Sequence, residues 1–348
     1  MDGLPTYVEG VALEISFGDA TRNLSELIFD TVRAAVDDSG RSMDEIDSVV
    51  LAAHDLVDGR SLSSMVTAPA AGAYLRDEIR YGDDGAAAFA AAVVRLEAGH
   101  ARRSIVAAWG RASEHDPRRF SRALFDPAMT RPLGLDEFVL SAMRAQLLLA
   151  TQEARRDRDR AAEARRKAAA ANPRALRSGG FRSSPHHPLR DEDLPLWADV
   201  TAAVVLSTEP SPVRVSGLGQ SSEPYAFGDR DPRAITSLRQ AAGRALEEAG
   251  LDAGAMDLAE IDGLTLIEEA MGLEAAGLAP PGQGLAHLAD DPRCNPSGGG
   301  AAGYCPPSMG LARIVEAVTR LSGGRRALAT GSSTVAGQTQ TAIVLEAE

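Results

Sequence analysis

The sequence has few of the residues on which several common functions depend. Aromatic residues make up only 4% of the chain, and the formal net charge is −13 at pH 7. The chain therefore has neither the base-stacking residues nor the basic surface that nucleic-acid binding requires. Its two cysteines, Cys294 and Cys305, form no Cys-x-x-Cys pair, and its six histidines show no zinc-site spacing. We expect no disulfide framework, no bound metal and no nucleic-acid partner.

Long apolar runs are also missing. No run approaches the ~18–20 residues that a membrane-spanning helix needs, so we expect no membrane span. We see no secretory signal and expect a cytoplasmic location. The 348 residues are 44% hydrophobic. That is enough for a large core, either in two domains or in one large duplicated domain.

A degenerate internal repeat runs through the chain. Residues 24–52 and 236–266 each pass from a Ser/Thr cap into an amphipathic helix, a glycine stop, an acidic turn and a short apolar strand. Residues 92–109 and 317–330 each pass from a helix end through a glycine and a basic turn into a buried strand. This order is common to many helix–strand units, but two pairs in the same order favour a duplication.

Helices alternate with apolar strands, which predicts a layered α/β fold. We place the boundary between two similar halves at 1–208 and 209–348, because Pro210 and Pro212 follow an apolar strand. The predicted strands are Ser48–Ala52, Ser104–Trp109, Ala202–Ser207, Val213–Val215 and Thr341–Glu346.

Residues of about 120–195 match neither repeat unit. They contain a predicted long helix from Leu135 to Ala171 and a Gly/Ser/Pro-rich loop from Ser178 to Pro188. We interpret this segment as an insertion that caps the functional face. The helix is dense in basic and acidic residues between Arg155 and Lys167. That pattern is typical of a solvated face with i,i+4 pairs, or of a cationic patch for phosphate groups.

A glycine-rich loop, Asn295–Gly310, leads into a predicted helix over Leu311–Leu321. It lacks the Gly-Lys-Ser/Thr of a P-loop, and Gly217-Leu218-Gly219 lacks the third glycine of a dinucleotide site. With Asn172-Pro173-Arg174-Ala175 in the insertion, the loop resembles the NPSGG…GHP…G signature of the thiolase superfamily. The resemblance is to the thiolase-like lipid-transfer-protein branch and covers most of the chain.

The resemblance implies a thiolase-like five-layered αβαβα fold of two duplicated halves, and a homodimer that forms through the N-terminal half. It implies an acyl-CoA thioester as substrate, with its pantetheine arm in a narrow tunnel, and no permanently bound cofactor. Arg155 and Arg156 are the candidate phosphate-binding residues. Backbone N–H groups around Gly298, Gly299 and Gly303 are candidates for binding the thioester oxygen.

Four departures from the family pattern change the expected chemistry. Gly82 falls where the resemblance places the nucleophilic cysteine, and as a candidate binding residue it leaves room for a branched or bulky acyl group. Asp262 replaces a His or Asn in Glu260-Ile261-Asp262-Gly263. Tyr304 replaces the histidine of the glycine-rich loop. The turn Ala329–Ser333 lacks the second cysteine. Together these changes exclude Claisen condensation through an acyl-enzyme.

A thiolase fold without its nucleophile can still stabilise a thioester enolate, which favours a CoA-thioester lyase. Relatives in this branch include steroid side-chain aldolases, which perform a retro-aldol cleavage of a β-hydroxyacyl-CoA. Tyr304 is the candidate base or acid, although a base role needs a positive field that favours phenolate. Asp262 is the candidate for relaying a proton or orienting the substrate. The alternatives are that Tyr304 only closes its loop and that Asp262 only caps its turn, as Asp83 and Asp84 do at a helix start.

Two other functions compete with the lyase. In the first, the chain is a catalytically silent subunit that binds acyl-CoA or scaffolds a heteromer. In the second, it is an acyltransferase that uses Cys305. A nucleophilic role for Cys305 is disfavoured because Pro306-Pro307 fixes the backbone beside it. The resemblance also implies a separate small partner protein with an OB-fold and a zinc ribbon, since this chain contains no such module.

Overall fold

The computed structural model describes residues 4–58 and 64–348. In this part of the chain, nine strands form one mixed sheet in the order β3-β2-β4-β5-β1-β6-β9-β8-β7. The strands are β1 (Thr6–Ser16), β2 (Ser48–Ala52), β3 (Asp77–Tyr81), β4 (Arg103–Arg111), β5 (Asp199–Ser207), β6 (Val213–Ser222), β7 (Leu258–Glu260), β8 (Arg326–Ser332) and β9 (Thr339–Ala347).

The helices of the first half are α1 (Leu24–Asp38), α2 (Asp55–Asp58), α3 (Ser64–Thr67) and α4 (Gly85–Glu97). The insertion carries α5 (Pro117–Leu124), α6 (Glu137–Leu148) and α7 (Gln152–Ala171). The second half contains α8 (Thr236–Ala249), α9 (Leu266–Ala275), α10 (Gly284–Asp290), α11 (Met309–Val318) and α12 (Thr334–Gly337). None of these helices is both long and apolar enough to cross a membrane.

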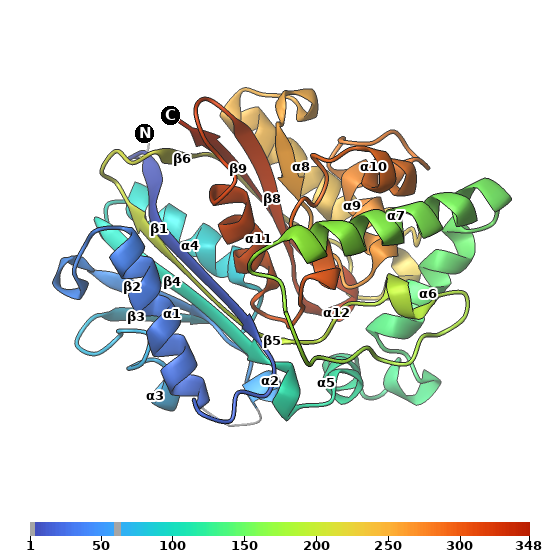
Figure 1. Ribbon diagram of the computed structural model, residues 1–348, viewed down its shortest axis with the longest axis horizontal. Helices are drawn as coiled ribbons and strands as arrows, with labels where there is room; N and C mark the ends of the chain where they lie inside the picture. The colour runs from blue at the N-terminus through green and yellow to red at the C-terminus, as the bar shows by residue number, and fades with distance from the viewer. Residues whose placement is uncertain (1–3, 59–63) are drawn as a thin grey trace.

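Alternating side chains along the strands divide the molecule into layers. In β2, Val49 and Leu51 face α1, whereas Val50 and Ala52 face the central helices α4 and α11. The strands of the second half share that central core, and α8 and α9 cover their outer face. Figure 1 shows α4 and α11 between the two halves of the sheet. This arrangement is the predicted five-layered αβαβα fold.

The two halves repeat the same strand pattern around the β1–β6 contact. The order β1-β5-β4-β2 corresponds to β6-β9-β8-β7, with a parallel pair at the far end of each series. Both first strands carry a bulge at the same place, between Val8 and Gly10 and between Val215 and Gly217. The predicted repeat units occupy equivalent positions, and the proposed boundary at residue 208 lies in the segment that joins β5 to β6.

Both bulge glycines allow close contact with the outer helix. A Cβ atom at Gly10 would lie 2.3 Å from the carbonyl oxygen of Ala35 in α1. A Cβ at Gly217 would lie 1.9 Å from the carbonyl oxygen of Ala245 in α8. Backbone atoms cannot move aside as a side chain can, so only glycine permits this spacing.

We expect Gly217→Ala to lower the free energy of unfolding by ~1–3 kcal/mol or more, because its Cβ would overlap the α8 backbone. The control is Gly243→Ala, an exposed position in α8 where a Cβ would meet nothing within 4 Å. That change is expected to raise helix stability by ~0.5–1 kcal/mol. Chemical denaturation followed by circular dichroism measures both, and equal stabilities would contradict the packing argument.

The insertion differs from its predicted form. A single helix over Leu135–Ala171 was expected, but the chain leaves the helix after Leu148 and starts again at Gln152. The Thr151 side chain accepts a hydrogen bond from the N–H of Ala154 and caps the new helix, which explains the break. Helix α7 packs on α10 of the second half (Figure 1). The insertion therefore covers the C-terminal half.

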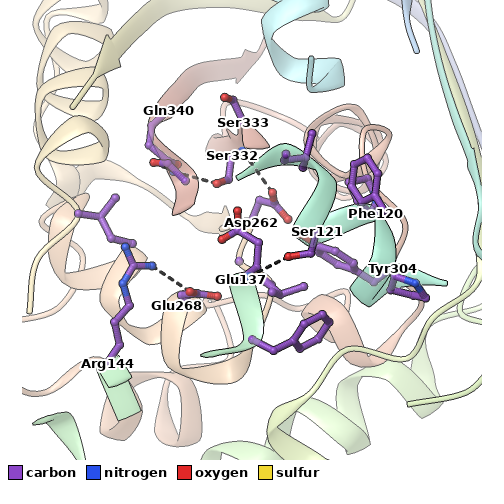
Figure 2. Close-up of a pocket in the computed structure, with 18 of the residues that line it drawn as sticks. Phe120, Ser121, Glu137, Arg144, Asp262, Glu268, Tyr304, Ser332, Ser333 and Gln340 are labelled. Carbon is purple, nitrogen blue, oxygen red and sulfur yellow. Dashed lines mark hydrogen bonds and ion pairs between the residues drawn. The ribbon is translucent and has the colours of Figure 1, made fainter. Parts of the chain in front are cut away.

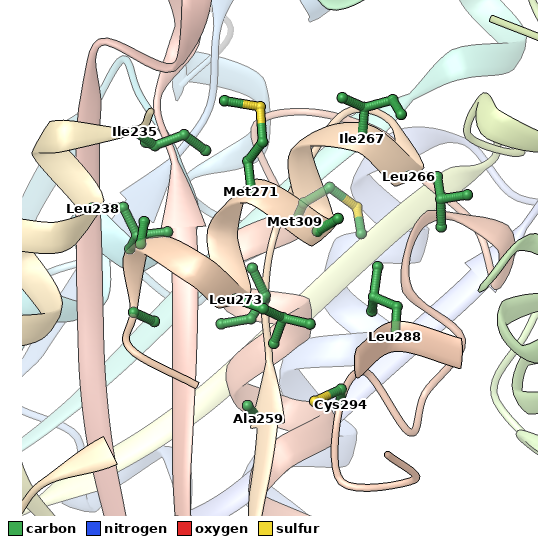
Figure 3. Close-up of a cluster of buried hydrophobic side chains, with 14 of the residues drawn as sticks. Ile235, Leu238, Ala259, Leu266, Ile267, Met271, Leu273, Leu288, Cys294 and Met309 are labelled. Atoms are coloured by element: carbon green, nitrogen blue, oxygen red, sulfur yellow. The ribbon is translucent and has the colours of Figure 1, made fainter. Parts of the chain in front are cut away.

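Helix α9 lies at the centre of the largest buried cluster, which is drawn in Figure 3. Leu266, Ile267, Met271 and Leu273 are all 2% exposed or less. Because α9 is buried on nearly all sides, it supplies a rigid base for the polar residues at its N-terminal end. The predicted helix after the glycine-rich loop is present as α11, which begins at Met309 and ends at Val318.

Candidate active site

A cavity lies between the insertion and the C-terminal half. Its volume is about 70 Å³. Figure 2 shows polar side chains gathered on one side of it and aromatic side chains on the other. The polar residues that line it include Glu137, Arg144, Asp262, Glu268, Tyr304, Ser332 and Gln340, and the apolar ones include Phe120, Leu124, Phe138, Trp197, Ile235 and Leu264.

Asp262 stands where the chain leaves β7. Its backbone N–H donates to Thr330 Oγ1 at 2.9 Å, and its Oδ2 accepts the N–H of Ser332 at 3.2 Å. The side chain is buried, yet Oδ1 has no hydrogen-bond partner among the described residues. Burial raises the pKa of Asp262 to about 6, although the Arg313 guanidinium acts in the opposite direction. The group is thus a carboxylate near neutral pH with one oxygen available to a ligand.

Tyr304 lines the same cavity from the glycine-rich loop. Its ring contacts Trp197 edge to face, with the ring centroids 5.5 Å apart. Its hydroxyl forms no hydrogen bond within residues 4–58 and 64–348, so it too is available to a ligand. Burial raises the pKa of Tyr304 well above 10, and the negative charges of Asp262, Glu268 and Asp84 add to this effect. The field around Tyr304 therefore keeps the phenol protonated.

Glu137 lines the cavity although its sequence context did not predict it. It occupies the first turn of α6, after the N-cap residue Asp136. Its backbone N–H donates to Ser121 Oγ at 2.8 Å, and its carboxylate accepts the N–H of Ala336. Burial raises the pKa of Glu137 to about 7. An acidic residue in a first helical turn is so common that the sequence carried no signal for this role.

An ion pair forms the next part of the wall. Arg144 Nη1 lies 2.9 Å from Glu268 Oε1, and its guanidinium lies 5.8 Å from the centre of the Phe227 ring. Burial raises the pKa of Glu268, with Arg144 opposing the shift. Because both partners are buried, the pair fixes α6 against α9 rather than moving freely in solvent.

The turn between β8 and β9 has a strained backbone beside the cavity. Val335 and Ala336 have φ angles of 63° and 60°, a region that non-glycine residues rarely adopt. Glu137 accepts the N–H of Ala336, and Arg230 Nη1 donates to the Ala336 carbonyl oxygen at 2.9 Å. Such strain persists only where surrounding contacts enforce it, and it is concentrated at functional sites.

The predicted glycine donors do not face this cavity. Gly298, Gly299 and Gly303 all have positive φ angles. A Cβ would lie 2.4 Å from Ala169 N at the first, 2.6 Å from Glu269 Oε1 at the second and 2.5 Å from Ile15 Cγ2 at the third. These glycines permit turning and close packing, and none of the three is among the residues that line the cavity.

A buried polar network holds the loop in place. Glu269 Oε1 accepts from Gly300 N–H at 2.8 Å and lies 3.0 Å from Arg165 Nη1. Asn172 Nδ2 donates to the Ser297 carbonyl oxygen at 3.0 Å. The Asn172–Ala175 motif therefore contacts the Asn295–Gly310 loop, and these two motifs carried the family resemblance. Hydrogen bonds from the insertion hold the glycine-rich loop in its conformation.

We expect Arg165→Met to destabilise the protein by ~3–5 kcal/mol, because it leaves the Glu269 carboxylate buried without its partner. The adjacent Arg166 is exposed and pairs with Glu163, so Arg166→Met is expected to change stability by less than ~0.5 kcal/mol. Thermal unfolding of both variants is the measurement. Equal melting temperatures would show that the buried pair does not support the loop.

The start of α4 is organised around Asp84 rather than Gly82. Gly82 is exposed, a Cβ there would meet nothing within 4 Å, and it does not line the cavity. Asp84 Oδ1 accepts Ala86 N–H at 2.8 Å, and Oδ2 accepts Gly310 N–H at 2.9 Å at the start of α11. Burial raises the pKa of Asp84 well above its usual value, and repulsion from Asp262 raises it further.

The remaining predicted residues also lie outside the cavity. Arg155 and Arg156 are exposed on α7, and Arg155 Nε donates to the Leu149 carbonyl oxygen at 2.9 Å. Cys305 is fully buried, and a Cβ at Gly110 would lie 2.7 Å from its sulfur. The structure therefore brings Asp262 and Tyr304 together and leaves the predicted glycines, arginines and Cys305 elsewhere.

Comparison with known proteins agrees with this architecture. The thiolase C-terminal domain-like family matches residues 219–346. An Ltp2-ChsH2(DUF35) aldolase structure is 19% identical, covers 100% of this chain and 99% of its own chain, and gives a TM-score of 0.79. The chain has the thiolase fold. No curated protein matches the sequence significantly.

Two further solved structures share the fold. A monomeric SCP2-thiolase-like protein type 1 from Mycobacterium smegmatis is 18% identical, with a TM-score of 0.73 over 100% of this chain and 78% of its own. The Acat5 thiolase from Ascaris suum, solved with coenzyme A, is 14% identical, with a TM-score of 0.75 over 99% of this chain and 100% of its own. The thiolase fold thus places the glycine-rich loop, Asp262 and Tyr304 in one C-terminal unit.

Proposed function

We propose that this thiolase-fold chain is a CoA-thioester lyase that cleaves a β-hydroxyacyl-CoA by a retro-aldol reaction without a covalent acyl-enzyme. The observation that carries the proposal is the pairing of two ligand-accessible groups in one cavity. They are the buried Asp262 Oδ1 without a hydrogen-bond partner and the Tyr304 hydroxyl. Similarity to structures named as an aldolase and as a thiolase in complex with coenzyme A supports the reaction class and the substrate class.

The two groups divide the first steps of the reaction. Asp262 is ionised at neutral pH and takes the proton of the β-hydroxyl group. The Cα–Cβ bond then breaks, Cβ becomes a ketone carbon, and the electron pair passes into a thioester enolate. The protonated Tyr304 donates a hydrogen bond to the enolate oxygen. Protonation of Cα yields a shortened acyl-CoA.

This assignment changes the role expected for Tyr304. A phenolate base would require a positive field, whereas the carboxyl groups of Asp262, Glu268 and Asp84 surround this residue. The proposed role is therefore that of a hydrogen-bond donor. The apolar side of the cavity, with Phe120 and Trp197 in its wall, suits an apolar acyl group, for which we propose a steroid side chain.

A catalytically silent acyl-CoA-binding subunit is the second candidate. The observation in its favour is the aromatic wall, in which Trp197 packs on both Phe138 and Tyr304 beside the carboxyl groups, because the volume of the cavity is only about 70 Å³. An acyltransferase that uses Cys305 is disfavoured, since the thiol packs against Gly110 outside the cavity.

We also propose a homodimer that forms through the N-terminal half. Strand β3 is the edge of the sheet in that half, and Met65, Tyr74 and Leu75 near it are 75%, 72% and 89% exposed. A small OB-fold/zinc-ribbon protein is the proposed second partner. The support for this partner is the solved Ltp2-ChsH2(DUF35) aldolase, which is named after two proteins.

The test is to incubate the purified protein, alone and with any co-purified partner, with β-hydroxyacyl-CoA esters of increasing bulk. Release of a ketone and a shortened acyl-CoA, followed by mass spectrometry, is the expected result. Cys305→Ser is expected to retain this activity because the thiol does not face the cavity. Binding of the esters without any cleavage would overturn the lyase and support the silent subunit.

A further inference from the structure

We propose that Glu137 is a second catalytic carboxyl group, which gives the enolate Cα its proton while Asp262 takes the proton of the β-hydroxyl. The proposal rests on the lyase function and adds the residue that completes the reaction. It also gives the insertion a chemical role, because Glu137 belongs to α6 while Asp262 and Tyr304 belong to the C-terminal half.

The placement of Glu137 suits contact with a substrate. It lines the cavity with Asp262 and Tyr304, and Figure 2 shows its side chain among theirs. Its carboxyl group accepts one hydrogen bond from the described residues, from Ala336 N–H to Oε1. Oε2 therefore remains available to a ligand. A group held through one oxygen has a fixed position and still presents the other oxygen to the reacting atoms.

The charges around Glu137 allow both protonation states near neutrality. Burial raises the pKa of Glu137 to about 7, and the carboxylate of Glu268 on α9 raises it further. The Ala336 N–H and the guanidinium groups of Arg144 and Arg230 act in the opposite direction. Asp262 at the end of β7 ionises at lower pH. At a pH between the two values, Asp262 accepts a proton while Glu137 carries one.

The proposed step conserves protons and electrons. The β-hydroxyl proton moves to Asp262, and the Cα–Cβ electron pair forms the enolate. The enolate then takes the Glu137 proton on Cα, and the thioester carbonyl re-forms. Asp262 ends the cycle protonated and Glu137 ends it ionised, so one proton exchanged through solvent restores both groups. No cofactor or redox partner is needed.

The same roles predict a bell-shaped dependence of the cleavage rate on pH. Activity rises as Asp262 loses its proton near pH 6 and falls as Glu137 loses its proton near pH 7. Besides the groups around Glu137, the carboxylate of Glu269 raises the pKa of Asp262 and the guanidinium of Arg313 lowers it. Asp262 in turn raises the pKa of Asp84. In Glu137→Gln the residual rate is expected to lose the fall on the alkaline side. A fall that persists in this variant would contradict the assignment.

The deciding experiment follows hydrogen exchange at Cα in the absence of a ketone. Wild-type protein is incubated with acetyl-CoA or propionyl-CoA in D2O, and deuterium at Cα is followed by mass spectrometry. We expect wild type to catalyse exchange and Glu137→Gln to slow it by ~10²-fold or more. Glutamine keeps an oxygen that accepts the Ala336 N–H, so the turn is preserved, and matching thermal unfolding checks this. Glu137→Asp should restore part of the exchange.

The outcomes separate this inference from the lyase function. Glu163→Gln changes a partly exposed carboxyl group of the insertion, outside the cavity lining, and is the control that should leave exchange and cleavage unchanged. The role of Glu137 is wrong if wild type cleaves hydroxyacyl-CoA while Glu137→Gln still exchanges Cα hydrogens at the wild-type rate. It is also wrong if wild type cleaves hydroxyacyl-CoA and shows no exchange. If wild type exchanges Cα hydrogens but cleaves no β-hydroxyacyl-CoA, the lyase function is wrong while the role of Glu137 stands.

Discussion

Asp262→Asn is expected to lower the rate of ketone release by ~10²–10⁴-fold. An amide is nearly the same size as the carboxylate and still accepts the N–H of Ser332, but it does not take the proton of the β-hydroxyl. Steady-state cleavage of a β-hydroxyacyl-CoA measures the effect. Asp290→Asn, an exposed position on α10, is the matched control and is expected to retain the wild-type rate.

Stability separates a catalytic loss from misfolding in this variant. The pKa of Asp262 in the folded protein is raised to about 6 from an ordinary value of 3.8. The folded state therefore holds this proton more tightly than the unfolded state, and its contribution to stability is lost as pH rises from about 4 through 6. Asparagine does not ionise, so this pH-dependent loss of stability is absent from the Asp262→Asn variant. The variant is therefore expected to unfold at pH 7 no more easily than wild type. A variant that is stable and still releases ketone normally would show that another group is the base.

Tyr304→Phe is expected to lower kcat by ~10²–10³-fold with little change in KM. The lost hydroxyl acts on charge that develops on the enolate oxygen, so ground-state binding is largely kept. The ring still packs on Trp197, and no hydrogen bond with the described residues is lost. Stability should therefore change by less than ~1 kcal/mol.

The matched control for this prediction is Tyr225→Phe. Tyr225 is 47% exposed and lies outside the cavity lining, so its hydroxyl has no role in cleavage. If the Tyr304→Phe variant keeps the wild-type kcat, Tyr304 only closes the glycine-rich loop. A raised KM with an unchanged kcat would instead assign it to substrate binding.

Much of the fold could be predicted from local patterns. The helix–glycine–strand units of residues 24–52 and 236–266 correspond to α1 with β2 and to α8 with β7. Their apolar period and glycine stops are local properties that the sequence displays directly. Strand β1 was missed although it lies at the centre of the sheet, because most of its side chains are only partly buried and its pattern is weak. The break at Thr151 was missed because a single N-cap threonine stood within a strongly helical composition.

The site was predictable only in part. Asp262 and Tyr304 come from separate motifs, and the fold brings both to one cavity. The charge around Tyr304 depends on Asp84, Asp262 and Glu268, which are distant in sequence, so its protonation could not be deduced from its own motif. Gly298 resembled a ligand-binding glycine, but its close neighbour is the backbone of Ala169 in the insertion. Such contacts depend on how segments pack, which no local pattern encodes.

The double cap at Asp84 limits the chemistry available at the start of α4. The N-terminal ends of α4 and α11 both donate to this one carboxyl group, so donors that would otherwise stabilise a thiolate or an enolate oxygen are already occupied. A cysteine introduced at Gly82 would stand exposed beside a buried acid instead of at an open helix end. A cysteine at this position would therefore lack the free helix N-terminus that lowers the pKa of a thiol and stabilises its thiolate.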